Sequence, residues 1–191
     1  MNIKIYFKKF ILAAALLYSG SAFAQTTDMQ ADPMVGGAAM YPAKNIVENA
    51  INSKDHTTLV AAVKAAGLVE TLEGDGPFTV FAPTNKAFSK LPAGAVDGLL
   101  KPENKAKLTA VLTYHVVAGR IDSKMLMDWI SKNNGSYTAK TVQGGELKFW
   151  MKGKNLFVTD EAGNSAKITI KDVYQKNGVI HVIDTVLMPK G

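Results

Sequence analysis

The residues whose types could support chemistry are three histidines, His56, His115 and His181, in a chain that has no cysteine. Without a thiol, cysteine catalysis, zinc–thiolate sites and iron–sulfur clusters are excluded. No two histidines have the spacing of a zinc-binding helix, in which the ligands stand four residues apart on one face. We therefore expect no metal site and no cofactor. A metal or proton-transfer site shared by His115 and His181 is the alternative.

The positions of the histidines indicate different surroundings. His56 follows Asp55 near a helix start, and we expect it to be solvated. His115 lies on the apolar face of a helix, and His181 interrupts the apolar run Val179–Ile183. A buried imidazole without partners costs about 1–3 kcal/mol, so His115 and His181 should be hydrogen-bonded inside the fold.

The sequence lacks the familiar catalytic and cofactor motifs. The stretch Gly163–Lys167 lacks the last glycine of a nucleophile elbow. Gly74–Gly76 precedes an apolar strand, whereas a dinucleotide-binding loop follows one. Asp160–Asn164 lacks the alternating ligands of a calcium loop and is typical of a hairpin turn. These absences predict that the protein is not an enzyme.

The elements that must position these residues follow a simple order. Apolar residues at helical spacing fill most of the first two thirds of the folded region, with Thr84 as an expected N-cap. Short apolar runs separated by turn residues predict strands, mostly in the last third, over residues 78–82, 136–142, 146–151, 155–159, 166–173 and 179–187. Helices followed by an antiparallel sheet indicate an α+β fold.

The first 24 residues have the layout of a secretory signal peptide. Lys4, Lys8 and Lys9 precede the apolar run Phe10–Tyr18, and small residues end at Ala24. The apolar run is well short of the ~20 residues that cross a bilayer. We predict cleavage after Ala24, and a soluble protein without a transmembrane segment that is secreted or periplasmic.

The next segment, residues 25–42, is rich in small residues and has no periodicity, which predicts a flexible N-terminal arm. Its methionines, Met29, Met34 and Met40, could in principle bind a soft metal, but a nonspecific tail is the favoured interpretation. A single folded domain is expected over residues 43–190.

The charge distribution argues against nucleic-acid binding. Without the three lysines of the leader, the net charge falls from +6 to +3. Arg120 is the only arginine, so bidentate recognition of phosphate or guanine is nearly excluded. No dense basic run is present.

Four segments, in this order, resemble the boxes of the fasciclin (FAS1) domain family. They are Asn45–Val47 with Thr58–Val63, Gly76–Phe88, the Tyr-His motif within Leu112–Val117, and the closing box Asn177–Pro189. The resemblance covers nearly all of residues 43–190. It implies a compact α+β domain in which a β-sandwich or wedge packs beside several helices. It also implies a secreted or cell-surface protein that binds other proteins, matrix or glycans.

The resemblance further implies candidate interaction residues. Adhesion in the family is often attributed to the Tyr-His motif and the closing box, which here give Tyr114, His115 and Asp184. From the residues alone, Asp184 in a buried strand needs a partner. Tyr114, His115 or a backbone donor could supply it.

A different surface follows from strand alternation. If Leu147, Phe149 and Met151 point inward, then the outer face is shared by Lys148, Trp150 and Lys152. A tryptophan flanked by lysines suits a partner protein, an acidic glycan or an anionic lipid surface. Alternatively, Trp150 packs under a loop and the lysines only protect a sheet edge.

These observations favour a non-enzymatic adhesion or interaction module that contacts an extracellular or envelope protein or glycan. The alternative is a carrier of an apolar ligand, because some soluble FAS1-like proteins bind carotenoids. A hydrolase has little support. A single domain gains avidity only if it forms a homo-oligomer.

Overall fold

The structure is a computed structural model that describes residues 32–190. The expected signal peptide, its cleavage site and the first part of the arm, with Met29, lie outside the described residues. The helices are α1 (Ile46–Ala50), α2 (Thr57–Ala66), α3 (Val69–Glu73), α4 (Asn85–Phe88), α5 (Ala95–Leu100), α6 (Lys105–Tyr114) and α7 (Ser123–Lys132), with 3-10 turns η1 (Lys54–His56) and η2 (Pro102–Asn104). Among these, no helix is long and apolar enough to span a membrane.

The helix starts are set by side-chain caps. Thr84 is the N-cap of α4, as expected, and its hydroxyl accepts from the Ala87 amide at 3.2 Å. Asn45 and Glu48 form a reciprocal capping box at α1. Asp122 caps α7 by accepting from the Met125 amide. These caps satisfy amide groups that a helix cannot pair internally.

Seven strands form one large sheet in the order β4-β3-β9-β8-β7-β6-β5. Their bounds are β3 (Phe78–Pro83), β4 (Val116–Ala118), β5 (Ser136–Lys140), β6 (Glu146–Lys152), β7 (Asn155–Thr159), β8 (Ser165–Gln175) and β9 (Gly178–Ile183). The central pair, β3 and β9, is parallel, whereas the other pairs are antiparallel. The antiparallel sheet expected for the last third of the chain is confirmed for β5–β9. The parallel pairing that joins β9 to β3 was not predicted. Strands covered on both faces are mostly apolar, and β3 and β9 are buried along nearly their whole length, with Thr79 and His181 as their polar residues.

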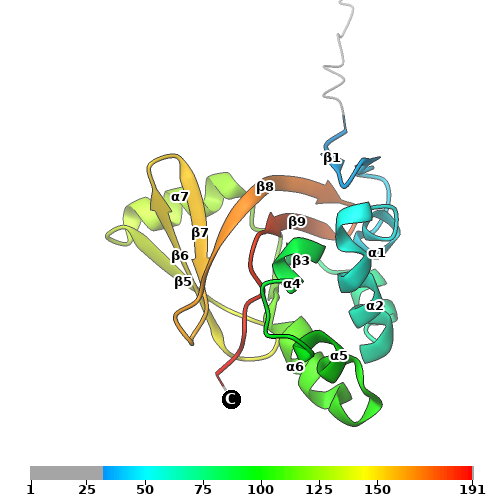
Figure 1. Ribbon diagram of the computed structural model, residues 1–191. Helices are drawn as coiled ribbons and strands as arrows, with labels where there is room; N and C mark the ends of the chain where they lie inside the picture. Colours follow the sequence, from blue (N-terminus) through cyan, green and yellow to red (C-terminus); the bar gives the residue numbers. More distant parts are fainter. Residues whose placement is uncertain (1–31, 191) are drawn as a thin grey trace, which may run out of the picture. The chain divides into compact units, whose positions relative to one another are not determined.

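Two hydrophobic cores lie on opposite faces of the central strands. In β3, Val80 and Ala82 belong to the core under α1, α2 and α6, whereas Phe81 belongs to the core under α7 and β5–β8. Strand β8 connects these regions, because it pairs with β9 and β7 and contains register shifts between Ile168 and Val173. Such irregularities bend a strand. The result is the β-wedge packed with helices that the family resemblance implies (Figure 1).

Residues 34–39 form a small hairpin, β1 (Met34–Val35) with β2 (Ala38–Ala39), and not a flexible arm. Val35 and Met40 are buried in the helical-side core, with Met40 2% exposed. At Gly36, φ is +59°, and an added Cβ would lie 2.3 Å from the Ser53 hydroxyl. The folded unit begins at Asp32, before the predicted start at Ala43. This hairpin was not predicted, because strands of two residues are too short to show the alternation of apolar and polar residues that indicates a strand.

Candidate functional site

Tyr114, at the end of α6, is completely buried. Its hydroxyl donates to the Glu146 carbonyl at 2.7 Å and accepts from the Glu161 amide at 3.0 Å. It therefore connects α6 to the start of β6 and to the β7–β8 turn. Burial raises the pKa of Tyr114 to about 12, because the charged phenolate would lose its hydration.

His115 follows directly and is held by backbone at both ring nitrogens. Nδ1 lies 2.8 Å from the Val111 carbonyl, and Nε2 accepts from the Leu187 amide at 3.0 Å. A carbonyl only accepts and an amide only donates, so the ring is neutral with its proton on Nδ1. Burial lowers the pKa of His115 to about 4.

His181 is held in the opposite tautomer. Its Nε2 lies 2.9 Å from the Ile121 carbonyl, and its Nδ1 accepts from the Asp172 amide at 3.3 Å. Burial lowers the pKa of His181. The prediction that His115 and His181 are hydrogen-bonded inside the fold is confirmed. Across residues 32–190, no group of three or more potential ligands among His, Asp and Glu is placed to hold a metal ion.

His56 differs from its prediction. It is 3% exposed rather than solvated, and its Nδ1 is 2.8 Å from the Ser53 hydroxyl. Within the described residues, its buried Nε2 has no hydrogen-bond partner. The N-terminal hairpin lies close by, because the Lys54 amide donates to the Gly36 carbonyl. Burial lowers the pKa of His56.

Asp184 lies one residue beyond β9 and is partly exposed, not within a buried strand. Its Oδ1 accepts from the Lys167 amide at 2.9 Å, so its main partner is a backbone donor. The Lys90 ammonium is 3.8 Å from its Oδ2. Neither Tyr114 nor His115 is among its described hydrogen-bond partners. The three residues implied by the resemblance therefore hold separate parts of the backbone.

The outer face of β6 agrees with the predicted alternation. Leu147 and Phe149 are buried, whereas Lys148 and Lys152 are exposed. Trp150 between them is half-buried. Its indole stacks on Phe157 of β7, with centroids 4.6 Å apart and planes inclined by 15°.

The indole of Trp150 is also fixed by a hydrogen bond. Its Nε1 donates to the Thr159 hydroxyl at 2.9 Å. An open depression of about 500 Å³ lies beside it, and its other lining residues are Asn134, Gly135, Ser136, Lys148, Thr159 and Ser165. The sequence analysis did not identify Phe157 as the stacking partner, because the pairing register of β6 with β7 cannot be derived from the pattern of either strand alone.

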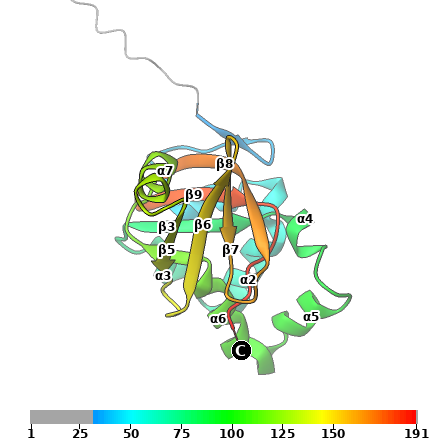
Figure 2. The same ribbon diagram turned by 90° about the vertical axis from the view of Figure 1, so that its left-hand side faces the viewer.

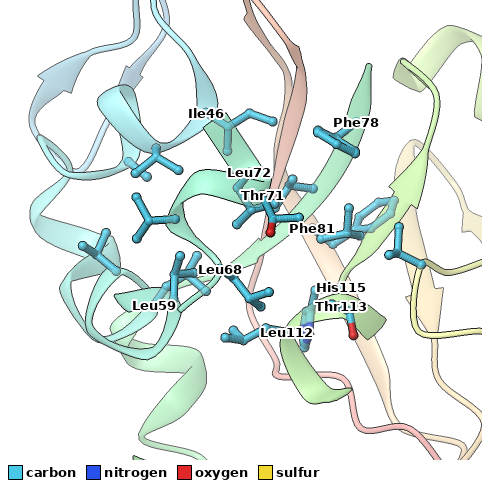
Figure 3. A pocket seen from close by; sticks show the side chains of 18 of the residues that line it. Ile46, Leu59, Leu68, Thr71, Leu72, Phe78, Phe81, Leu112, Thr113 and His115 are labelled. Carbon is cyan, nitrogen blue, oxygen red and sulfur yellow. The ribbon is translucent and has the colours of Figure 1, made fainter. Parts of the chain in front are cut away.

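A second feature is an apolar cavity of about 70 Å³ between the helices and the central strands. Figure 3 shows Ile46, Leu59 and Leu72 around it, with Phe78 on the strand side. Two polar side chains at its wall bind elsewhere, since both nitrogens of His115 bind backbone and the Thr113 hydroxyl donates to the Thr109 carbonyl. The sequence did not predict this cavity, because a small packing gap leaves no pattern along a chain.

A model of the fasciclin domain matches residues 54–189 of the chain. The chain belongs to the fasciclin domain family. This confirms the resemblance read from the four segments. The match spans the Tyr-His motif, the closing box and the outer face of β6.

Three relatives of this fasciclin domain are bacterial proteins. It is 45% identical to "Protein sll1483" of Synechocystis over 168 residues, 88% of this chain and 86% of that protein. It is 35% identical to "Cell surface glycolipoprotein MPB83" of Mycobacterium bovis, over 86% of this chain and 77% of that protein. It is 41% identical to "Immunogenic protein MPB70" of the same species, over 73% of this chain and 66% of that protein.

Among solved structures, a FAS1 domain pair from the insect cell adhesion molecule Fasciclin I shares the fold. The TM-score is 0.69 at 18% identity, over 84% of this chain. The fasciclin domain described here spans only 58% of that structure, which contains two such domains.

Proposed function

We propose that this fasciclin domain is a non-catalytic interaction module that is exported by its leader and binds an extracellular or envelope partner. The family match and the relative named as a cell surface glycolipoprotein support a role outside the cytoplasm. The signal-peptide layout of residues 1–24 supports export, with cleavage after Ala24.

The observation that carries the proposal is the outer face of β6 and β7. Trp150 and Phe157 form a stacked pair that is only half-buried, with exposed Lys148 and Lys152 on either side of Trp150. Aromatic residues are enriched where proteins bind partners. Tyr114 and His115 are instead committed to internal backbone bonds, so we assign them the role of holding the fold that presents this face.

A test combines localisation with retention. In the first part, fractions of the producing cells are probed for the protein, whose mass should correspond to the chain without residues 1–24. In the second part, washed envelope material is tested for its ability to retain the purified protein. Trp150→Ala should reduce retention. Trp129→Phe, which changes the other tryptophan, is the control, because Trp129 lies on α7 and packs on Tyr137, which is on the opposite face of the sheet from Trp150. Full-length protein in the cytoplasm, or equal retention of Trp150→Ala and the parent protein, would contradict the proposal.

The apolar cavity keeps a second candidate open, the carriage of an apolar ligand. Its volume of about 70 Å³ is far below the roughly 300–1,000 Å³ of small-molecule pockets. A group of a few carbons fits this space, whereas a carotenoid is far larger than it. Xenon or benzene binds dry engineered cavities of about 150 Å³. Raised thermal stability under xenon, without visible absorbance in the purified protein, would support a small apolar ligand; no change under xenon would refute it.

A further inference from the structure

Strand register arranges the side chains around Trp150 in rows. Ser136, Trp150, Phe157 and Lys167 are paired directly across β5, β6, β7 and β8. Paired residues point to the same face of a sheet, and neighbouring strands lie about 4.8 Å apart. This row is therefore roughly 14 Å long. It begins with a small hydroxyl side chain, continues with two aromatic rings and ends with a lysine.

The neighbouring row adds hydroxyl groups and a second lysine. It consists of Thr138, Lys148, Thr159 and Ser165. Lys152 lies two residues beyond Trp150 on β6, so lysines stand roughly 7 Å to either side of the indole along the strand. We call Lys148, Trp150, Lys152, Phe157 and Lys167 the aromatic–lysine face. Figure 2 turns β6 and β7 towards the viewer.

The charge of this face is unbalanced. Among the described residues, ion pairs join Lys90 with Asp184 and Lys132 with Asp128, and none involves a lysine of the aromatic–lysine face. The acidic groups near it are at its borders. Glu146 pairs across strands with Lys140, and Asp184 accepts from the Lys167 amide. Glu146 shares the outer face of β6 with Lys148, two residues away, but no ion pair among residues 32–190 joins them, so Lys148 and Lys152 can attract an anionic ligand.

The arrangement of side chains on the aromatic–lysine face indicates which class of anionic ligand it can bind. The large hydrophobic side chains that are truly exposed lie elsewhere in the described residues, at Met34, Tyr41, Ile51, Met125, Val142 and Tyr174. Insertion into a membrane surface requires protruding apolar groups, and the core of a protein interface is depleted of charged residues. Here Trp150 lines an open depression together with the hydroxyl groups of Ser136, Thr159 and Ser165 and with Lys148, and its other side stacks on Phe157. A sugar ring presents an apolar C–H face and many hydroxyl groups, which fits that arrangement.

We propose that the aromatic–lysine face binds an acidic polysaccharide, with a sugar ring against Trp150 and the sugar's carboxylate or sulfate groups paired with Lys148 and Lys152. This inference rests on the proposed function and names its ligand class. Binding involves no covalent step. Because the lysines are exposed, their attraction is screened by salt, and affinity should fall as ionic strength rises.

The chain provides its own reporter for this test. It has two tryptophans, so Trp129→Phe leaves Trp150 as the only source of indole fluorescence. The probes are an oligouronate and a neutral dextran oligomer of equal length. We expect the oligouronate to change Trp150 emission saturably and dextran to leave it unchanged. In the matched variant Trp150→Phe, which retains Trp129, emission should not respond.

Charge variants supply the decisive comparison. Lys148→Glu with Lys152→Glu should weaken oligouronate binding at least about tenfold. Lys101→Glu with Lys105→Glu makes the same change in net charge on exposed sites near α5 and α6, away from β6 (Figure 1), and should bind as the parent does. The inference would be overturned if both pairs of substitutions weakened oligouronate binding equally, or if dextran bound as tightly as the oligouronate.

Two further probes separate the sources of an anion. Vesicles rich in phosphatidylglycerol and an acidic protein are titrated in the same way. A Trp150 response to either of these, without a response to the oligouronate, would refute a polysaccharide ligand. If the oligouronate fails while envelope retention still depends on Trp150, the ligand class is wrong and the proposed function stands. If that retention is also independent of Trp150, both fail.

Discussion

At the scale of single residues, the two side chains of the Tyr-His motif form hydrogen bonds that link distant parts of the backbone. Tyr114 connects α6 to Glu146 and Glu161, whereas His115 connects it to Leu187 in the closing segment. Two adjacent residues thereby join three segments that are distant in sequence. A motif with this role is recognisable in the sequence because buried polar groups need partners at fixed positions.

Replacing Tyr114 tests this role. Tyr114→Phe leaves the Glu161 amide and the Glu146 carbonyl without their partner, which should cost about 1–3 kcal/mol in the free energy of unfolding. Urea denaturation measures this. Tyr41→Phe, at an exposed tyrosine, should change it by less than about 0.5 kcal/mol.

The same tyrosine predicts a loss of stability in alkali. The folded pKa is about 12, above the unfolded value of about 10, so the unfolded chain loses this proton first. Stability should therefore fall as the pH rises above about 10. Tyr114→Phe should lack this part of the decline, and an identical pH dependence in both proteins would contradict the assignment.

The histidines predict acid sensitivity. His115 has a folded pKa of about 4, below the unfolded value of about 6.5, so its stabilisation is complete above pH 6.5 and is lost as the pH falls towards 4. The loss for His115 alone should be about 2 kcal/mol at pH 5. His181 and His56 act in the same direction, since burial lowers the pKa of both.

Urea midpoints at pH 7.5 and pH 5.0 check this expectation. His115→Gln should be less stable than the parent at pH 7.5, because the internal bonds are disturbed. It should lose less on acidification, because one titrating group is gone. A parent protein with the same midpoint at both pH values would rule out burial of neutral histidines.

The outcome for single residues shows what a sequence can predict. His115 and His181 lie in apolar runs, and their burial was foreseen. His56 looks solvated because its neighbours Lys54 and Asp55 are charged, yet it is buried near the N-terminal hairpin. The outward position of Trp150 followed from strand alternation. Its stack on Phe157 depends on cross-strand register, which no local pattern contains.

At the scale of elements, strongly patterned segments were predicted well. The strand at Asn155–Thr159 has the expected bounds, and β3 extends only one residue beyond its prediction. The strand β4 was missed because it has only three residues and is separated from the end of α6 by a single residue. The parallel pairing of β3 with β9 was also missed, since it joins segments about a hundred residues apart. Pairing partners at that distance are chosen by the whole core.

The N-terminal hairpin provides a test at this scale. Met40 is 2% exposed and Met34 is 60% exposed, although they belong to the same small element. Met40→Ala should reduce the free energy of unfolding by about 2–5 kcal/mol, as expected for a buried side chain. Met34→Ala should have an effect below about 0.5 kcal/mol. Equal, small effects would show that the segment is an arm, as its sequence suggests.

At the scale of the folded unit, the central strands divide the interior into two cores that differ in how tightly they are packed. The core under α7 and β5–β8 contains Val158, which is completely buried. The helical-side core contains Val63, which lines the apolar cavity. A well-packed core resists added volume, whereas a cavity accepts it.

Adding one methylene group to each core tests this difference. Val158→Ile should destabilise the protein by about 1–3 kcal/mol, because the side chain has no free space. Val63→Ile should be neutral or stabilise it by about 0.5–1 kcal/mol, because the group enters the cavity. Urea midpoints of the two variants give the comparison. If Val63→Ile costs as much as Val158→Ile, the space beside α2 is not available to a methylene group, and it would not be available to a small apolar ligand either.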